Sequence, residues 1–415
     1  GVLGLTQSYN CVRQLYNCSI MVSCSCFRCC LFSLALLCPF AIIGFALSLA
    51  FNKVEDVTPP DARGSRAVDT LKFVVVISRH GNRGSYFSFP NDPYPINDTN
   101  YWPYGSAELT TYGRIQMYKL GVKIRSLYNG FLDPLYYSND FYASSTAVDR
   151  TLISGEAFLA GLFPPTGFQL WNKKILWQPV PIYSNSLDKT MVVELCARFV
   201  QEQIISEMNY ENENAFNLTF VNSCLNRNTG SNMSGGFGLI TAWDTFISEE
   251  TEGYVLPDWT KQVFPQPMTF LIRRLYLAYF AATDMMVKFI IGQFYKEMLG
   301  VMESKVNGTL TPNRKMYFYS GHDTSIVTLQ AVLGIPKSEI IGAVKPGSAM
   351  LFELHQNMTT EDYFVEVLYI DGSSSDLTPV PIDISACGHP CGFKQLVNMT
   401  QNFVNITNYE EECQI

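Results

Sequence analysis

Positive charge and histidine are scarce in this sequence. The 415 residues include 29 lysines and arginines against 37 aspartates and glutamates, a formal net charge of -8 at pH 7, and there are four histidines. Because a nucleic-acid partner requires a basic surface, this balance argues against one. The chain also has no internal repeat and no extended low-complexity tract, which excludes a solenoid of repeated units. An acidic chain that binds a phosphate must concentrate its cations at one place.

Charged residues are also missing from a long N-terminal stretch, Leu31 to Phe51. A run of 21 uncharged residues is typical of a membrane-spanning helix and of a secretory signal. Ser48 and Ala50 suit cleavage by signal peptidase, but the run exceeds the usual signal core of roughly 7 to 15 residues. We therefore predict a signal peptide or a signal-anchor within an N-terminal extension, residues 1–70, with membrane attachment through 31–51 in the second case. A buried core helix is disfavoured because the run has no polar face.

Among the few cations, two arginines flank one histidine. Arg79, His80 and Arg83 belong to the sequence R-H-G-N-R, which directly follows the apolar run 73–77. That run is typical of a buried strand, and the loops that leave such strands carry the chemistry in α/β enzymes. Imidazole can attack phosphorus, and guanidinium groups hold phosphate oxygens through paired hydrogen bonds. The pattern therefore predicts a phosphate site that forms a phosphohistidine, against the alternative of solvated side chains on a loop.

A second ionisable pair, His322 and Asp323, follows another β-rich segment, 315–320. It would supply a further cation for a phosphate and a carboxyl group that protonates the leaving oxygen. Taken alone, such a pair is more typical of an ordinary loop or a helix cap. Arg150 lies between the two clusters in the sequence and is either a third phosphate-binding guanidinium or a surface salt-bridge residue.

The patterning of the chain predicts an α/β fold. Helical spacing from Leu109 to Tyr128, with Thr110 or Thr111 at its start, follows the first strand and gives a strand, loop and helix unit. The other predicted elements are strands at 140–143 and 175–180, helices at 192–208 and 267–298 on either side of an Asn-, Gly- and Ser-rich stretch at 209–238, and a hairpin of strands at 349–355 and 363–369. We expect a central, mostly parallel sheet flanked by helices in a domain of residues 71–415, with a smaller helical insertion at about 185–300.

From Leu71 to Cys413, the order and spacing of the motifs resemble the histidine acid phosphatases, the group of the histidine phosphatase superfamily that contains the prostatic and lysosomal enzymes. The resemblance rests on the R-H-G-x-R loop, V-D-R-T at 148–151, L-F-P-P at 162–165, L-W-Q-P at 176–179 and the H-D pair at 322–323. It implies that the chain is an acid phosphatase. Such an enzyme would hydrolyse small phosphomonoesters through a phosphohistidine, with no metal or other cofactor. A homodimer is one option for its assembly.

The resemblance also implies a role for each candidate site residue. His80 is the nucleophile and Asp323 is the proton donor. The phosphate ligands are Arg79, Arg83, Arg150 and His322. The other two histidines, His355 and His389, are assigned no direct catalytic role and are expected to be packing, surface or loop residues.

The sequence departs from the family pattern near the first motif and before V-D-R-T. The family usually has Asp at the position of Asn82 and Pro at that of Ser85, and it commonly has Asp at the position of Ala147. None of these differences removes an assigned nucleophile, acid or phosphate ligand, so we expect activity with altered efficiency or substrate preference. The rivals are a phosphoglycerate mutase-like enzyme, which also uses R-H-G, and a secreted or surface binding protein on a catalytically impaired phosphatase scaffold.

Five of the 12 cysteines lie in the predicted domain. The resemblance implies two disulfides, Cys196 with Cys413 and Cys387 with Cys391, which leaves Cys224 without a partner. The C-G-H-P-C sequence at 387–391 would also suit zinc, but a local disulfide is favoured in an oxidising compartment.

Seven N-x-S/T sequons in the same domain are candidate glycosylation sites: Asn97, Asn217, Asn232, Asn307, Asn357, Asn398 and Asn405. Together with the signal or anchor, they predict delivery to the secretory pathway. The protein would be secreted, lysosomal or membrane-anchored, with its catalytic domain on the extracytoplasmic side.

Overall fold

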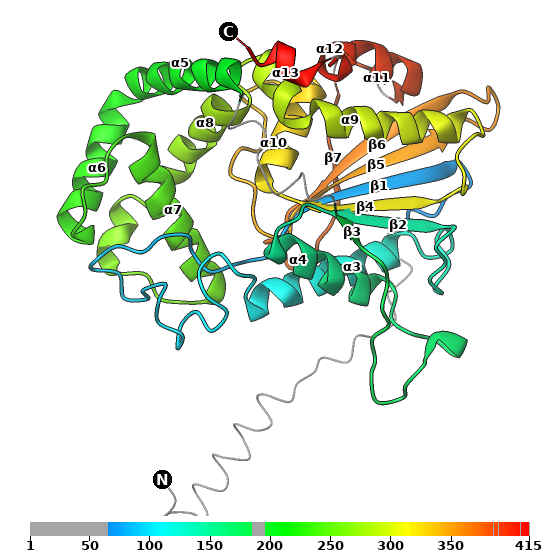
Figure 1. Ribbon diagram of the computed structural model, residues 1–415, viewed down its shortest axis with the longest axis horizontal. Coiled ribbons are helices and arrows are strands. Elements are labelled where there is room, and N and C mark those ends of the chain that lie inside the picture. The colour runs from blue at the N-terminus through cyan, green and yellow to red at the C-terminus, as the bar shows by residue number, and fades with distance from the viewer. Residues whose placement is uncertain (1–64, 185–195, 385, 389, 407, 415) are drawn as a thin grey trace, which may run out of the picture. The chain divides into compact units, whose positions relative to one another are not determined.

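Eight strands form one sheet in the computed structural model (Figure 1). The structure describes residues 65–184, 196–384, 386–388, 390–406 and 408–414, and all of them belong to one compact unit. The strands lie in the order β3-β2-β4-β1-β5-β6-β7, with β8 beside β6. Their bounds are β1 (Leu71–Arg79), β2 (Phe141–Ser145), β3 (Tyr183–Ser184), β4 (Met316–Gly321), β5 (Ala349–Gln356), β6 (Tyr363–Ile370), β7 (Val380–Pro381) and β8 (Cys391–Gly392).

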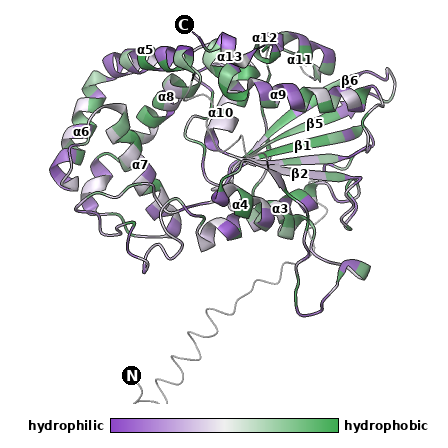
Figure 2. Ribbon diagram, viewed as in Figure 1, coloured by the Kyte–Doolittle hydropathy of each residue, from purple (hydrophilic) through white to green (hydrophobic). Residues whose placement is uncertain are grey.

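The central strand, β1, is buried because its sequence is apolar on both faces. Residues 73–77 are each at most 1% exposed. Figure 2 shows the same hydrophobic character along β1 and β5. The predicted strand at 73–77 is therefore confirmed, and it extends from Leu71 to Arg79.

The sheet is parallel on one side of β1 and antiparallel on the other. β4 runs parallel to β1 and β2, whereas β5 runs antiparallel to β1 and β6. The α/β class is confirmed, but a mostly parallel arrangement describes only the half formed by β3, β2, β4 and β1. In the other half, a short turn joins β5 to β6, and strands joined by a short turn are antiparallel neighbours.

Helices cover both faces of the sheet (Figure 1). One face carries α3 (Thr111–Leu127) and α4 (Asp149–Leu162), and the other carries α9 (Asp284–Val306), α10 (Asp323–Val332), α11 (Phe393–Met399) and α12 (Gln401–Val404). α3 confirms the predicted helix that follows the first strand. Its N-terminus is capped by Thr110, whose Oγ1 accepts a hydrogen bond of 3.0 Å from the Gly113 N–H.

Four further helices, which we call the cap, lie beside the sheet (Figure 1). They are α5 (Ala197–Glu213), α6 (Ala215–Thr229), α7 (Gly235–Glu252) and α8 (Met268–Phe280). The cap has a hydrophobic core of its own, in which Trp243 and Phe246 are buried. In contrast, α9 packs against the sheet. A short helix, α13 (Tyr409–Glu412), lies near the C-terminal end of the described chain.

Three expectations from the sequence are wrong. The helix predicted at 267–298 is two helices, α8 and α9, bent by 77° at the break between them, because Thr283 caps a new helix by accepting a hydrogen bond from the Met286 N–H. Residues 175–180 form no strand but an exposed irregular segment in which Leu176 is 77% exposed, because Pro179 cannot donate a ladder hydrogen bond. The Asn-rich stretch at 209–238, expected to separate helices, contains α6. Leu218, Val221 and Leu225 lie on one face of α6 and are buried in the cap, so packing overrides the low helix propensity of asparagine.

Within the described part of the chain, no single helix is long and apolar enough to cross a membrane. α8 and α9 meet that test only as a pair that is bent by 77°. The predicted signal or anchor at 31–51 lies outside the described residues, as does His389.

Candidate active site

The two predicted clusters meet at the C-terminal ends of two central strands, β1 and β4. β1 and β4 are parallel neighbours in which Arg79 pairs with Gly321, so the residues that follow the two strands emerge side by side. The His80 N–H donates to the Gly321 carbonyl at 3.0 Å. The ring centroids of His80 and His322 lie 5.6 Å apart. The structure thus brings together the motifs at 79–83 and 322–323.

The glycine of the first motif lets the loop lie against two helices. A Cβ atom on Gly81 would lie 2.2 Å from the carbonyl oxygen of Gly113 at the start of α3. The Gly81 N–H donates to Ser154 Oγ of α4 at 3.1 Å. A larger residue at position 81 would therefore push the loop, and the histidine before it, away from the helices.

A hydrogen bond of the His80 ring defines which of its two nitrogens carries the proton. Its Nδ1 lies 2.8 Å from the carbonyl oxygen of Gly81. Because a carbonyl oxygen only accepts, Nδ1 must carry the proton, which leaves the lone pair of the neutral ring on Nε2. Burial lowers the pKa of His80 well below its usual value, and the charges of Arg79 and Arg150 lower it further. The ring is therefore neutral at mildly acidic pH, with Nε2 as the nucleophilic atom.

Three arginines near this ring each have an unused donor. The Nε atoms of Arg79, Arg83 and Arg150 are buried, and none donates a hydrogen bond to a described residue. Such donors are rare in folded proteins because each costs about 1–3 kcal/mol when it is left unpaired. An anion with several oxygen atoms would satisfy donors of this kind through charge-assisted hydrogen bonds.

The protein fixes two of these guanidinium groups in place. Arg79 donates to the Val344 carbonyl and lies 3.1 Å from a carboxylate oxygen of Asp323. Arg83 forms two hydrogen bonds with Asp244, of 2.6 and 3.1 Å. Because both side chains are already oriented, little conformational entropy is lost when an anion binds.

Asp323 begins α10 and is ionised in the free site. Its carboxylate accepts a hydrogen bond of 2.8 Å from the N–H of the next residue, Thr324, and one of 3.3 Å from the Tyr276 hydroxyl. Burial raises the pKa of Asp323, but the positive charge of Arg79 and of the other nearby basic groups outweighs burial, so the net shift is downward. A bound phosphate would add negative charge beside Asp323 and move this pKa upward.

His322, predicted as a further cation, is neutral in the free site. Burial and then the charge of Arg150 lower its pKa to about 4. Its Nε2 lies 3.0 Å from Thr146 Oγ1. His322 would gain positive charge only when a bound anion offsets the nearby arginines.

Asn82, where the family pattern has Asp, contacts helix α7 of the cap. Its side-chain amide donates to a carboxylate oxygen of Glu252 at 2.7 Å and to the Ser248 carbonyl at 3.2 Å. A carboxylate at position 82 could donate neither bond and would lie beside the like charge of Glu252. This departure from the family pattern is therefore matched by its partners in the cap.

Ser85, where the family pattern has Pro, is also buried and bonded. Its hydroxyl lies 3.1 Å from Thr245 Oγ1 and donates to the Phe87 carbonyl. With the pair of Arg83 and Asp244, these contacts attach the phosphate loop to α7. The motifs gave no signal for these partners, because they lie 160 to 170 residues further along the chain.

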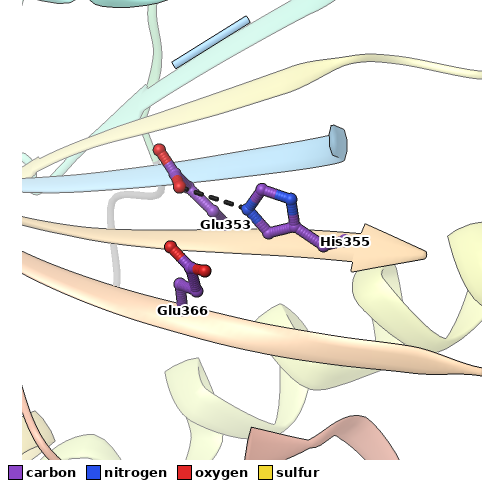
Figure 3. A group of neighbouring side chains, drawn as sticks. All are labelled: Glu353, His355 and Glu366. Atoms are coloured by element: carbon purple, nitrogen blue, oxygen red, sulfur yellow. Dashed lines mark hydrogen bonds and ion pairs between the residues drawn. The ribbon is translucent and has the colours of Figure 1, made fainter. Parts of the chain in front are cut away.

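A second group of ionisable side chains lies on β5 and β6, toward the end of the sheet opposite His80 (Figure 3). The acceptor atoms of Glu353, His355 and Glu366 lie within 4.8 Å of one another, a spacing that a metal ion could use. Arg66, however, pairs with both carboxylates, and the Tyr128 hydroxyl donates to Glu353 at 2.6 Å. Arg66 supplies the positive charge that these carboxylates need, so we interpret the group as a structural ion network.

The structure contains both disulfides that the resemblance implies, Cys196 with Cys413 and Cys387 with Cys391. Cys224 is buried in the cap and forms no disulfide. Asn217 is partly exposed, and the other six sequon asparagines are exposed. Glycosylation at these positions stays a prediction.

Comparison with protein families agrees with this geometry. Residues 70–370 match the model of the histidine phosphatase superfamily (branch 2). The chain belongs to this superfamily. Lysosomal acid phosphatase of Homo sapiens is 32% identical over 393 residues, which cover 89% of this chain and 84% of the relative. Prostatic acid phosphatase of Mus musculus is 31% identical over 356 residues, which cover 83% of this chain and 89% of the relative.

Among solved structures, the Hafnia alvei phytase in complex with tartrate has a TM-score of 0.61 at 19% identity and covers 83% of this chain and 98% of its own. The Citrobacter braakii phytase has a TM-score of 0.56 at 16% identity and covers 83% and 99%. At this level of identity the likeness shows a shared fold. The family and the curated relatives identify the chain as an acid phosphatase.

Proposed function

We propose that this acid phosphatase hydrolyses small phosphomonoesters in two steps through a phosphohistidine, without a metal ion. In the first step, the Nε2 lone pair of His80 attacks phosphorus in line. The ester P–O bond breaks, and Asp323 donates a proton to the departing oxygen. In the second step, water attacks the phosphohistidine, Asp323 accepts a proton from that water, and phosphate and neutral His80 are released.

The observation that carries this proposal is the convergence of three arginines, Arg79, Arg83 and Arg150, on His80, whose tautomer leaves Nε2 free. Arg79, Arg83 and Arg150 place positive charge where a phosphoryl group develops negative charge in the transition state. In other phosphoryl transfers, a single arginine contributes on the order of 10³ to 10⁵ in rate. The arginines therefore take the role that a metal ion has in many other phosphatases.

The proton that Asp323 donates can arrive with the substrate. Asp323 is ionised in the free site, whereas the second pKa of a phosphomonoester lies near 6. Below about pH 6 the ester is mainly a monoanion that carries one proton. Transfer of that proton to Asp323 loads the general acid, which gives a physical reason for activity at acidic pH.

We also infer that the protein is delivered to the secretory pathway and is secreted or lysosomal. The two disulfides support this location, because such bonds persist in oxidising compartments. The similarity to lysosomal and prostatic acid phosphatases supports the same location. The rival of an impaired scaffold is not favoured, because Asn82 and Ser85 both have matched partners on α7.

The test is turnover of an aryl phosphate by the full chain at pH 5, with and without EDTA. We expect activity that is indifferent to EDTA. With a ³²P-labelled substrate, a rapid alkaline quench should trap a labelled protein that loses its label in acid, and His80→Ala should show neither label nor turnover. Loss of activity on chelation would refute the metal-free mechanism, and turnover by His80→Ala would refute the assigned nucleophile.

A further inference from the structure

Three exposed aromatic side chains adjoin the phosphate-binding arginines. The ring of Tyr86 lies with its centroid 4.1 Å from Arg83 Cζ and 5.4 Å from Arg150 Cζ. The ring centroids of Tyr86 and Phe87 lie 6.3 Å apart, and those of Phe87 and Phe237 lie 5.7 Å apart. We call these three side chains the aromatic row. It extends from the guanidinium groups toward solvent.

The aromatic row exposes contiguous apolar surface next to charged groups. Tyr86, Phe87 and Phe237 are 42%, 43% and 64% exposed. Single exposed aromatic residues are ordinary, but contiguous apolar surface beside a polar site is typical of ligand-binding surfaces.

The backbone of the row is held in place by the cap. The Tyr86 N–H donates to a carboxylate oxygen of Asp244 at 3.1 Å, and the Phe87 carbonyl accepts from Thr245 Oγ1 at 3.0 Å. Phe237 itself belongs to the first turn of the same helix, α7. These contacts hold the backbone that carries the row before a ligand arrives, which lowers the ordering entropy lost on binding.

We propose that the aromatic row is the subsite for the leaving group and that it favours phosphomonoesters whose leaving group is a planar aromatic ring. This inference rests on the proposed function, because it takes Arg83 and Arg150 as phosphate ligands. A phosphate held by these arginines lies next to Tyr86, and the group esterified to it is then within reach of the row. An aromatic ring in that place gains both buried apolar area and ring-to-ring contact, worth about three- to tenfold in affinity beyond area alone.

The test uses phosphonates as competitive inhibitors of the full-length enzyme. Phenylphosphonate and ethylphosphonate have no ester bond to break, so the ratio of their inhibition constants reports binding without leaving-group chemistry. Inorganic phosphate reports the arginines alone. We expect phenylphosphonate to bind at least about fivefold more tightly than ethylphosphonate.

Substitutions then assign this preference to the row. Tyr86→Ala and Phe237→Ala should each reduce the ratio about threefold or more, whereas Tyr86→Phe should keep it. Phe216→Ala is the matched control, because Phe216 is an 86% exposed phenylalanine on α6. It should leave all three inhibition constants unchanged.

The possible outcomes separate this inference from the proposed function. If phosphate inhibits but the phenyl-to-ethyl ratio is near one, or is unchanged in both alanine variants, the subsite is refuted and the phosphatase mechanism stands. If neither phosphate nor the phosphonates compete with substrate, the proposed phosphate site is refuted. Should Tyr86→Ala also weaken inorganic phosphate, through loss of its contact with Arg83, Phe237→Ala decides, because Phe237 has no such contact among the described interactions.

Discussion

Glu249 of α7 and Asp92 are buried carboxyl groups that interact with each other. Two buried carboxylates repel each other when both are ionised, so one of them is favoured to keep its proton. Burial, and then the charge of Asp92, raise the pKa of Glu249 to about 9. Asp92 also accepts a hydrogen bond of 2.8 Å from the Tyr94 N–H, which suits it to the ionised role.

Glu249 therefore contributes stability to the folded protein at acidic pH that is lost as the pH becomes alkaline. The native state holds a proton that the unfolded chain releases above its ordinary glutamate pKa of about 4.3. The contribution of Glu249 is thus complete below that pH and is lost as pH rises toward 9, by at most about 1.4 kcal/mol per pH unit. Glu249→Gln has nearly the same shape but cannot titrate, so its melting temperature should fall less between pH 5 and pH 8 than that of the wild type.

The matched control is Glu250→Gln, which changes the next residue of the same helix, an exposed glutamate. It should retain the wild-type dependence of melting temperature on pH. If Glu249→Gln and the wild type lose the same stability between pH 5 and pH 8, Glu249 does not hold a proton in the native state.

The assignment of Asp323 as proton donor predicts a dependence on the leaving group. Asp323→Asn removes the acid but leaves His80 and the arginines in place. A nitrophenyl ester needs little protonation, so we expect it to lose much less activity than an alkyl ester such as glycerol phosphate. The difference should reach about tenfold to a hundredfold in kcat/KM. Equal losses for both esters would leave Asp323 with only a positioning role.

The contact between Asn82 and α7 predicts that the residue usual in the family is harmful here. Asn82→Asp places a carboxylate beside Glu252 and removes two donated hydrogen bonds. We expect kcat/KM for an aryl phosphate to fall about tenfold or more. The double variant Asn82→Asp with Glu252→Gln restores a donor and should recover much of that loss. Full activity of the single variant would show that the loop does not depend on this contact.

The network around Glu353 predicts a strong effect of Arg66 on stability. Arg66→Met leaves a fully buried carboxylate without its main partner, so the free energy of unfolding in urea should fall by about 3 kcal/mol. Lys261→Met is the control, because its pair with Asp258 is exposed at both ends. Lys261→Met should change the free energy of unfolding by too little to measure. A similarly small effect of Arg66→Met would mean that Tyr128 and His355 suffice to stabilise Glu353.

Local features of the chain were sufficient to predict the strand that leads to His80 and the helix that follows it, but not α4, which carries Arg150, or α10, which begins with Asp323. The apolar run of β1 and the capping threonine of α3 act over a few residues, and the sequence carries both. Parallel pairing of β1 with β4 then places the residues after each strand at one edge, as expected of an α/β sheet.

The other features of the site and the cap depend on tertiary contacts that no local sequence pattern encodes. Asp244 and Glu252 are ordinary acidic residues of an amphipathic helix until the fold places them against the phosphate loop. Packing against the cap makes a helix of the Asn-rich stretch around Leu218, and the protonated state of Glu249 follows from burial beside Asp92. The tautomer of His80 depends on the position of one carbonyl group.

The bond between Cys196 and Cys413 has a consequence for the protein under proteolysis. It joins the residue before α5 to the end of the described chain, across 217 positions, and so closes the cap, α9, α10 and the strands β4 to β8 into one covalent ring. A protease that cuts once inside this ring opens the chain without releasing a fragment. The nicked molecule keeps both pieces at high effective concentration until the disulfide is reduced. On a gel, it would migrate as one species without reductant and as two with it.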